Sequence, residues 1–196
     1  MSLKRSPLAP KRFPTLPPIA GVSFATAACG IKYKGRTDVC LMVMDAGSTV
    51  AGVLTRSKTA SAPVDWCRQQ LPHGRARAII VNSGNANAFT GKTGETSVRR
   101  VVEAVAASLG CRRQDVLAAS TGVIGQPLPT EKFVQAVQAL PKKLKADGLK
   151  DAAAAIMTTD TYPKGAVRRT EIGGKPVTIA GIAKGSGMIA PDMATM

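Results

Sequence analysis

Four segments of this 196-residue chain are unusually rich in small polar residues and glycine. They are residues 82–91 (NSGNANAFTG), 120–125 (STGVIG), 157–164 (MTTDTYPK) and 184–195 (KGSGMIAPDMAT). Hydroxyl groups can act as nucleophiles or as donors to a developing oxyanion, and the Lys184 cation suits a carboxylate. Each segment taken singly also has a structural interpretation, because asparagine and glycine make turns and Ser120 or Thr121 can cap a following element.

Cysteine and histidine chemistry has little support in the sequence. The four cysteines are irregularly spaced and form no CxxC pair, so we predict buried, reduced thiols and no metal site. They are Cys29, Cys40, Cys67 and Cys111. The one histidine, His73, lies in a polar stretch typical of a solvated loop. A Ser-His-Asp triad would depend on that residue, so a nucleophile in this chain is expected to find its base elsewhere.

The net charge of +15 leaves several classes of partner open. It is compatible with nucleic acid, with anionic substrates, or with an acidic protein partner. The basic residues are scattered and aromatic residues make up only 4% of the chain, so no stacking platform for nucleic acid is indicated. A basic nucleic-acid-binding module therefore remains a minor alternative, and we expect no nucleic-acid partner.

The chain has no apolar run of the roughly 18–20 residues that span a bilayer. Its first residues also lack the apolar stretch of a secretory signal. We therefore expect a cytoplasmic protein without a membrane partner. Residues 1–20 are basic and interrupted by prolines, which predicts a flexible arm.

The patterns of apolar residues predict strands and helices that alternate irregularly. Strands are expected at 39–45 and 49–55, paired as a hairpin around residues 46–48, and at 78–82, 116–120, 167–172 and 176–183. The last two flank Gly173-Gly174, which indicates a second hairpin. Helices are expected at 96–109, after a Thr130 cap, and at 149–157. Since hairpins accompany the helices, the prediction is a mixed α/β layered fold and not a purely parallel, doubly wound sheet.

Taken together, the polar segments identify a family. The chain closely resembles the ornithine acetyltransferases, also called glutamate N-acetyltransferases, from Gly21 to its end. The most specific element is KGSGMIAPDMATM at residues 184–196, with STGVIG and MTTDTYPK at matching distances before it. The resemblance implies a layered α/β sandwich of the ornithine acetyltransferase and DmpA-like type. It also implies a flexible arm at 1–20, an α-chain domain at 21–194, and the start of a β chain at 195–196.

The resemblance also implies self-processing between Ala194 and Thr195. The Thr195 hydroxyl would attack the Ala194 carbonyl, and water would hydrolyse the resulting ester. The freed α-amine of Thr195, with a reference pKa of about 7.7–8.0, could then take the proton from its own hydroxyl. This arrangement would explain why no histidine is needed.

By the same resemblance, other residues surround this nucleophile. The Thr121 hydroxyl and the Gly122 backbone N–H would form the oxyanion hole. Thr158 and Lys184, together with Thr195, would bind the substrate. The Lys184 charge could also lower the pKa of the Thr195 amine.

The reaction implied is ping-pong acetyl transfer in arginine biosynthesis, from N-acetylornithine to glutamate, through an acetyl-threonine. No cofactor is expected, although some family members also accept acetyl-coenzyme A as donor. The expected partner is the β chain of the same precursor, in an assembly of two α and two β chains, and the chain by itself is expected to be inactive. A self-processing aminopeptidase or hydrolase with an N-terminal nucleophile remains the alternative.

Overall fold

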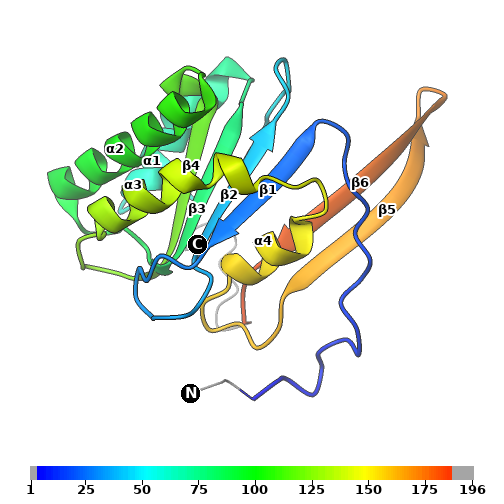
Figure 1. The fold of residues 1–196 in the computed structure, drawn as a ribbon, viewed down its shortest axis with the longest axis horizontal. Helices are drawn as coiled ribbons and strands as arrows, with labels where there is room; N and C mark the ends of the chain where they lie inside the picture. Colours follow the sequence, from blue (N-terminus) through cyan, green and yellow to red (C-terminus); the bar gives the residue numbers. More distant parts are fainter. Residues whose placement is uncertain (1–3, 187–196) are drawn as a thin grey trace.

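A computed structural model describes residues 4–186 of the chain, and Figure 1 shows its layered arrangement of strands and helices. The strands are β1 (Val22–Ala27), β2 (Val39–Met44), β3 (Ala78–Asn85), β4 (Val116–Val123), β5 (Lys164–Ile172) and β6 (Lys175–Ala183). The α-helices are α1 (Ala62–Gln70), α2 (Gly91–Leu109), α3 (Thr130–Ala139) and α4 (Leu149–Ala155). Short 3₁₀ turns η1 (Leu71–His73), η2 (Arg113–Asp115) and η3 (Pro141–Lys143) follow α1, α2 and α3.

The larger sheet has the strand order β1-β2-β3-β4. β2 is antiparallel to both β1 and β3, whereas β3 and β4 are parallel. The helix α2 makes the crossover that a parallel pair requires. The predicted mixed α/β fold, with hairpins and without a purely parallel sheet, is therefore confirmed.

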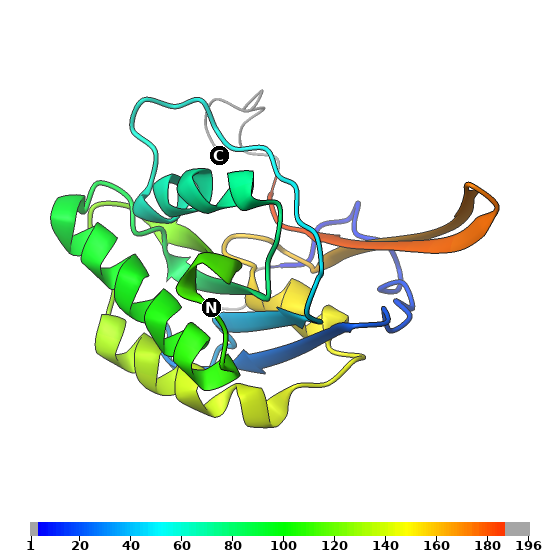
Figure 2. The same cartoon turned by 90° about the horizontal axis from the view of Figure 1, so that it is seen from above.

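The sheet separates two layers of helices (Figure 2). Helices α2 and α3 cover one face, where Val39 and Leu41 of β2 contribute to a common core with the valines of α2. The other face carries α1 over β4 and α4 over β1 and β2, with Cys40 packed in the α4 cluster. Alternate residues of β2 thus serve opposite cores, as the two-residue period of a strand requires. This burial on both faces explains why residues 39–44 read as a continuous apolar run.

The hairpin β5–β6 projects from the body of the molecule, which Figures 1 and 2 show from two directions. Its strands pair from Lys164↔Ala183 to Ile172↔Lys175, as predicted around the two glycines. Only its base joins a core, where Ala180 and Ile182 pack against the α4 cluster. This base brings Lys184, the residue after β6, back beside the segment that precedes β5.

The first described residues, 4–20, contain no helix or strand. They nevertheless contact the start of β5: a Cβ on Gly165 would meet Phe13 at 2.7 Å and Leu16 at 3.1 Å. The Ser6 N–H also donates to the Thr161 hydroxyl at 3.3 Å. The flexibility of this arm stays a prediction.

The predicted hairpin of residues 39–45 with 49–55 is wrong. β2 is hydrogen-bonded to β1 on one side and to β3 on the other, so no edge remains for a further strand. Residues 49–55 form no strand, and their only β-bridge joins Thr49 to Arg75. Val50 and Leu54 are apolar because they pack over the cluster beneath α1.

The predicted start of α2 was also late, because Asn87 anchors the first turn of the helix. This buried residue has φ +46°, donates from Nδ2 to the Gly94 carbonyl at 3.0 Å, and accepts from the Thr90 hydroxyl at 2.9 Å. α2 therefore begins at Gly91 and not at residue 96.

Other boundaries also differ from the prediction. Thr130 does not cap α3, since its hydroxyl donates to Ser97 and Leu128 and the N-cap is Pro129. α4 ends at Ala155, two residues before the predicted end. β3 and β4 each run three residues further than predicted, to Asn85 and Val123, into the polar segments themselves.

Candidate active site

Thr121 and Gly122 lie near the end of β4, the outer strand of the sheet. Earlier in β4, two carbonyls face outward, away from β3. The Val116 carbonyl accepts from Trp66 Nε1 at 2.8 Å, and the Ala118 carbonyl accepts from Cys67 Sγ at 3.1 Å. Helix α1 therefore covers the first half of this edge.

The second half of this edge includes a carbonyl that faces β3 instead of the outer side. The Val123 carbonyl faces β3 and accepts from the Ala86 N–H at 2.9 Å. Gly122 is exposed and lies beyond the part of the edge that α1 covers. Thr121 is partly exposed, and its hydroxyl makes no hydrogen bond among residues 4–186. Both residues thus lie at the end of β4 that α1 leaves uncovered.

Gly122 also has a structural reason to be glycine. Its φ is +136°, a backbone conformation that other residues rarely adopt. A Cβ at this position would lie 2.3 Å from the Gly84 carbonyl carbon and 2.6 Å from the Asn85 nitrogen. Close approach of β3 and β4 therefore requires glycine here, whatever the role of its N–H in binding.

The segment 82–91 holds the end of β4 in place. Asn82 is fully buried, accepts from the Ser120 hydroxyl at 2.6 Å, and donates to the Asn85 carbonyl at 2.9 Å. Asn85 in turn donates from Nδ2 to the carbonyls of Gln126 at 3.0 Å and Pro127 at 3.3 Å. We call Asn82, Asn85 and Ser120, with the two carbonyls, the asparagine network. It orders the strand end that presents Thr121 and Gly122.

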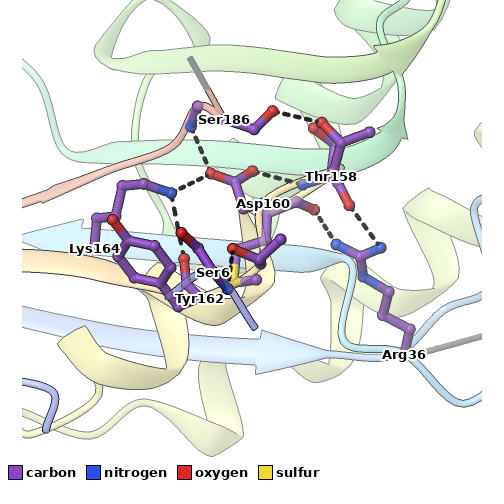
Figure 3. A network of polar contacts seen from close by, with 11 residues as sticks. Ser6, Arg36, Thr158, Asp160, Tyr162, Lys164 and Ser186 are labelled. Carbon is purple, nitrogen blue, oxygen red and sulfur yellow. Dashed lines mark hydrogen bonds and ion pairs between the residues drawn. The ribbon is translucent and has the colours of Figure 1, made fainter. Parts of the chain in front are cut away.

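A second network is centred on Asp160, whose side chain is only 1% exposed. One carboxylate oxygen accepts from the Thr158 N–H at 3.1 Å, and the other accepts from Lys164 Nζ at 2.8 Å and from the Gly185 N–H at 2.5 Å (Figure 3). Burial would raise the pKa of the Asp160 carboxyl, but these three hydrogen bonds outweigh it and hold that pKa below its ordinary value. We call these four residues the Asp160 network.

Two further contacts reinforce this region. The guanidinium of Arg36 donates to the carbonyls of Met157 and of Thr158, the latter at 3.2 Å. The hydroxyls of Thr159 and Ser186 lie 2.9 Å apart (Figure 3). Segments around residues 36, 157–164 and 184–186 are therefore joined, although they are far apart in the sequence.

The predicted site residues are only partly gathered by these contacts. Thr158 is partly buried and belongs to the Asp160 network through its backbone, and Lys184 is exposed next to Gly185. Lys184 forms no ion pair within residues 4–186. No hydrogen bond in that range joins Thr158 or Lys184 to Thr121 or Gly122. Ala194 and Thr195 lie outside the described residues.

Sequence reasoning missed Asp160 and Arg36. The signal for Asp160 was present, since it is the only acid of the segment 157–164 and stands four residues before Lys164. Nothing in the sequence pointed to Arg36, because its partners are backbone carbonyls more than a hundred residues away. Such partners carry no side-chain pattern that a single sequence could display.

Within the described residues, the cysteines and the histidine give little support for a second nucleophile or a metal site. The four cysteines of the described part are unpaired, and burial raises the pKa of the Cys40 thiol to about 12. Burial, followed by the nearby Asp38 carboxylate, also raises the pKa of Cys29 to about 12, so both thiols are protonated at neutral pH. His73 is exposed, as expected of a loop histidine. Residues 4–186 contain no cluster of three or more potential metal ligands, and none of their helices is long and apolar enough to span a membrane.

Comparison of the chain with known proteins points to one family. The chain is 60% identical over all 196 residues to the arginine biosynthesis bifunctional protein ArgJ of Rhizobium meliloti, and 57% identical to that of Agrobacterium fabrum. It covers 48% of each of these proteins, so the chain spans about half the length of the curated relatives it matches.

Two crystal structures share the fold. The arginine biosynthesis bifunctional protein of Bacillus halodurans is 36% identical with a TM-score of 0.82, over 88% of this chain and 90% of that one. The ornithine acetyltransferase of Mycobacterium tuberculosis, complexed with ornithine, is 38% identical with a TM-score of 0.80, over 89% and 92%. The ArgJ family profile matches residues 23–196. The chain therefore belongs to the ArgJ family.

Proposed function

We propose that this chain is the α portion of an ornithine acetyltransferase, which transfers acetyl groups from N-acetylornithine to glutamate in arginine biosynthesis. The observation that carries the proposal is the family match over residues 23–196, which includes the end of β4 and the whole segment from Lys184 to Thr195. The 38% identity to a protein named ornithine acetyltransferase supports the same substrate class.

The precursor would first cut itself at Ala194–Thr195. The Thr195 hydroxyl adds to the Ala194 carbonyl, the C–N bond breaks, and the acyl group moves to oxygen while the nitrogen gains a proton. Water then hydrolyses the ester, leaving a carboxylate on Ala194 and a free amine on Thr195. That amine accepts the hydroxyl proton when Thr195 attacks the donor substrate.

Acetyl transfer would proceed by two such attacks. Thr195 Oγ takes the acetyl group from N-acetylornithine, and ornithine leaves with its amine protonated. The glutamate amine then attacks the acetyl ester and releases N-acetylglutamate and the threonine hydroxyl. Each tetrahedral intermediate carries an oxyanion, for which we propose the N–H of Gly122 and the hydroxyl of Thr121 as donors. That hydroxyl makes no hydrogen bond within residues 4–186, which supports this role.

The second region would bind the substrate. Thr158 is held by its backbone between Asp160 and Arg36, which supports a role for its side chain in positioning. Lys184 is an exposed cation within the described part and suits the carboxylate of an amino-acid substrate. We propose that a β chain from the same precursor completes the site, in a cytoplasmic assembly of two α and two β chains.

A second donor is also proposed, since the curated relatives at 57–60% identity are named bifunctional. Acetyl-coenzyme A would then acetylate Thr195 and leave as the free thiol, so that glutamate N-acetylation no longer depends on ornithine turnover. Incubation of the processed protein with labelled acetyl-coenzyme A and glutamate should yield labelled N-acetylglutamate. A protein that transfers only from N-acetylornithine would be monofunctional.

The decisive experiment uses the full-length gene. Intact mass spectrometry should find two fragments, the second beginning at Thr195. Labelled N-acetylornithine without glutamate should place one acetyl group on the peptide that starts there. The Thr195→Ala precursor should stay uncut and inactive, whereas Thr195→Ser should retain some cleavage and transfer.

Three results would overturn this function. One is label on another residue, and another is acetyl transfer by the Thr195→Ala variant. The third is consumption of the acyl-enzyme by water at the same rate with and without glutamate, which would favour the hydrolase alternative.

A further inference from the structure

Asp160 differs from the other ion-paired carboxylates of residues 4–186 in how deeply its side chain is buried and in its contacts to two proposed functional segments. A buried carboxylate is costly unless it is paired and hydrogen-bonded. This one is paired with a single lysine and accepts two backbone N–H groups, one from each of two segments. The other ion-paired carboxylates of the described chain have side chains at least 12% exposed.

The two backbone N–H groups that donate to Asp160 come from different segments of the chain. Thr158 belongs to the segment that follows α4, and Gly185 belongs to the segment that follows β6. Gly185 has φ +141°, and a Cβ there would meet nothing within 4 Å. Steric crowding therefore does not impose the conformation of Gly185. The hydrogen bond from its N–H to Asp160 is the contact that orients this peptide.

Gly185 is also the residue after Lys184, at the start of the chain that leads to the proposed scissile bond. The direction of the peptide at Gly185 sets how this chain leaves the hairpin. Reactions that depend on attack by a neighbouring hydroxyl are sensitive to small displacements of the reacting atoms. The Thr159–Ser186 contact at 2.9 Å adds a second tie between the same two segments.

We propose that Asp160 is a positioning residue, which aligns the Thr158 segment with the Lys184–Gly185 backbone for self-cleavage and for binding of the donor substrate. This inference rests on the proposed function, since it assigns Asp160 a role in that same site. Asp160 acts through Thr158 and Gly185 and takes no part in the bond changes. Lys164 balances its charge, and Arg36 holds the Thr158 segment from the opposite side.

The test compares two identical substitutions in the full-length precursor. Asp160→Asn leaves one oxygen to accept where two accept now, and its new NH₂ group faces donors. Asp151→Asn is the matched control, because Asp151 pairs with Lys145 at 2.6 Å but its side chain is 48% exposed. The first-order rate constant of self-cleavage should fall about 10- to 100-fold for Asp160→Asn and stay within about threefold for Asp151→Asn.

The first-order rate constant of self-cleavage distinguishes a positioning role of Asp160 from an effect of the substitution on stability alone. A destabilised precursor would lower the fraction that cleaves, but each folded molecule would cleave at the parent rate. The processed Asp160→Asn protein should also show a higher KM for N-acetylornithine, with a smaller change in the KM for glutamate. A parent-like rate constant with a parent-like KM would overturn the proposal.

Hydrogen exchange of the parent protein supplies a measurement that does not depend on the variant folding. The Thr158 and Gly185 amides should exchange at least about tenfold more slowly than those of the exposed loop residues Arg56 and Lys58. Equal exchange rates would also overturn the role of Asp160. If the parent precursor neither cleaves nor accepts an acetyl group on Thr195, the proposed function fails; if it does both and Asp160→Asn matches it, only the present inference fails.

Discussion

Two polar regions of this chain hold their segments together by different chemistry. The asparagine network uses neutral amides and a hydroxyl, and it joins β3 to the end of the neighbouring strand β4. The Asp160 network uses one buried charge, and it joins the two segments that continue beyond the last pair of the β5–β6 ladder, Lys164 with Ala183. The difference shows that neighbouring strands can be fixed by uncharged groups, whereas the two segments beyond the end of the β5–β6 ladder are held by the stronger, charge-assisted hydrogen bonds.

The two regions also differ in the surroundings of their glycines, Gly122 and Gly185. The largest expected effect is the loss of stability when Gly122 is replaced. Gly122→Ala would strain a φ of +136° and press a Cβ against the backbone of Gly84 and Asn85, whereas Gly185→Ala meets open space. Strain costs about 1–3 kcal/mol at either position, and overpacking adds about 1–3 kcal/mol at Gly122 alone. Urea unfolding of the two variants should therefore give the larger loss for Gly122→Ala. Equal losses would mean that β3 and β4 separate easily at this point.

Within the first region, neighbouring hydroxyls should have separate roles. Thr121→Ala removes a proposed oxyanion donor and should lower turnover by about 10²–10³-fold, with little change in substrate affinity. Ser120→Ala removes the bond to Asn82 and should cost about 0.5–1.5 kcal/mol of stability, with turnover within about threefold of the parent. Steady-state kinetics and unfolding curves check both. If the two variants have the same profile, Thr121 is as structural as Ser120.

The two networks should differ in their response to acid. The folded pKa of Asp160 lies below its unfolded value, so its stabilisation is complete above the unfolded pKa of about 3.9 and is lost as the pH falls through the folded pKa. The amides of Asn82 and Asn85 do not titrate. Exchange of the Thr158 and Gly185 amides, corrected for intrinsic rates, should therefore accelerate as the pH falls below about 4, more than exchange around Asn85. A parallel acceleration in both regions would show global loosening.

A further test of the difference between the two networks replaces Asn82, which is fully buried. Asn82→Ala leaves the Ser120 hydroxyl and the Asn85 carbonyl without their partner and should cost about 1–3 kcal/mol. This loss should be equal at about pH 5 and pH 8, because no titrating group is involved. Denaturant titrations at the two pH values measure it. A loss that depends on pH would indicate coupling to a charged group.

The smallest expected effect concerns Lys184, which is exposed in the described chain. Lys184→Met keeps the stem and removes the cation, so the KM for N-acetylornithine should rise about tenfold. The pKa of the Thr195 amine should rise when the neighbouring cation is lost, and the acid limb of the pH–rate profile should move to higher pH. Unchanged kinetics between about pH 6 and pH 9 would make Lys184 a solvated surface residue.

Much of the fold could be predicted because its signals are local. The valines of α2 at helical spacing, and the two glycines between β5 and β6, each determine a structure within a few residues. The false hairpin at 39–55 shows the limit of such signals. Of the apolar residues at 49–55, Val50 and Leu54 pack over the cluster beneath α1, whereas Val53 is 80% exposed. Whether such a run pairs with β2 depends on which strands already occupy the edges of β2.

By itself, the sequence determined the family, since hydroxyl, glycine and lysine residues occur in it at characteristic spacings, and the same residues led to the chemistry that we propose. It also determined that the fold mixes hairpins with helices. Only the tertiary structure decided that Gly122 must be glycine because two backbones meet there. It also decided that Arg36 contacts carbonyls more than a hundred residues away, and that Asp160 joins Thr158 to Gly185 through their backbone N–H groups. The physical reason is that every residue has the same backbone donors and acceptors, so contacts to them leave no trace in residue type and appear only when the chain is folded.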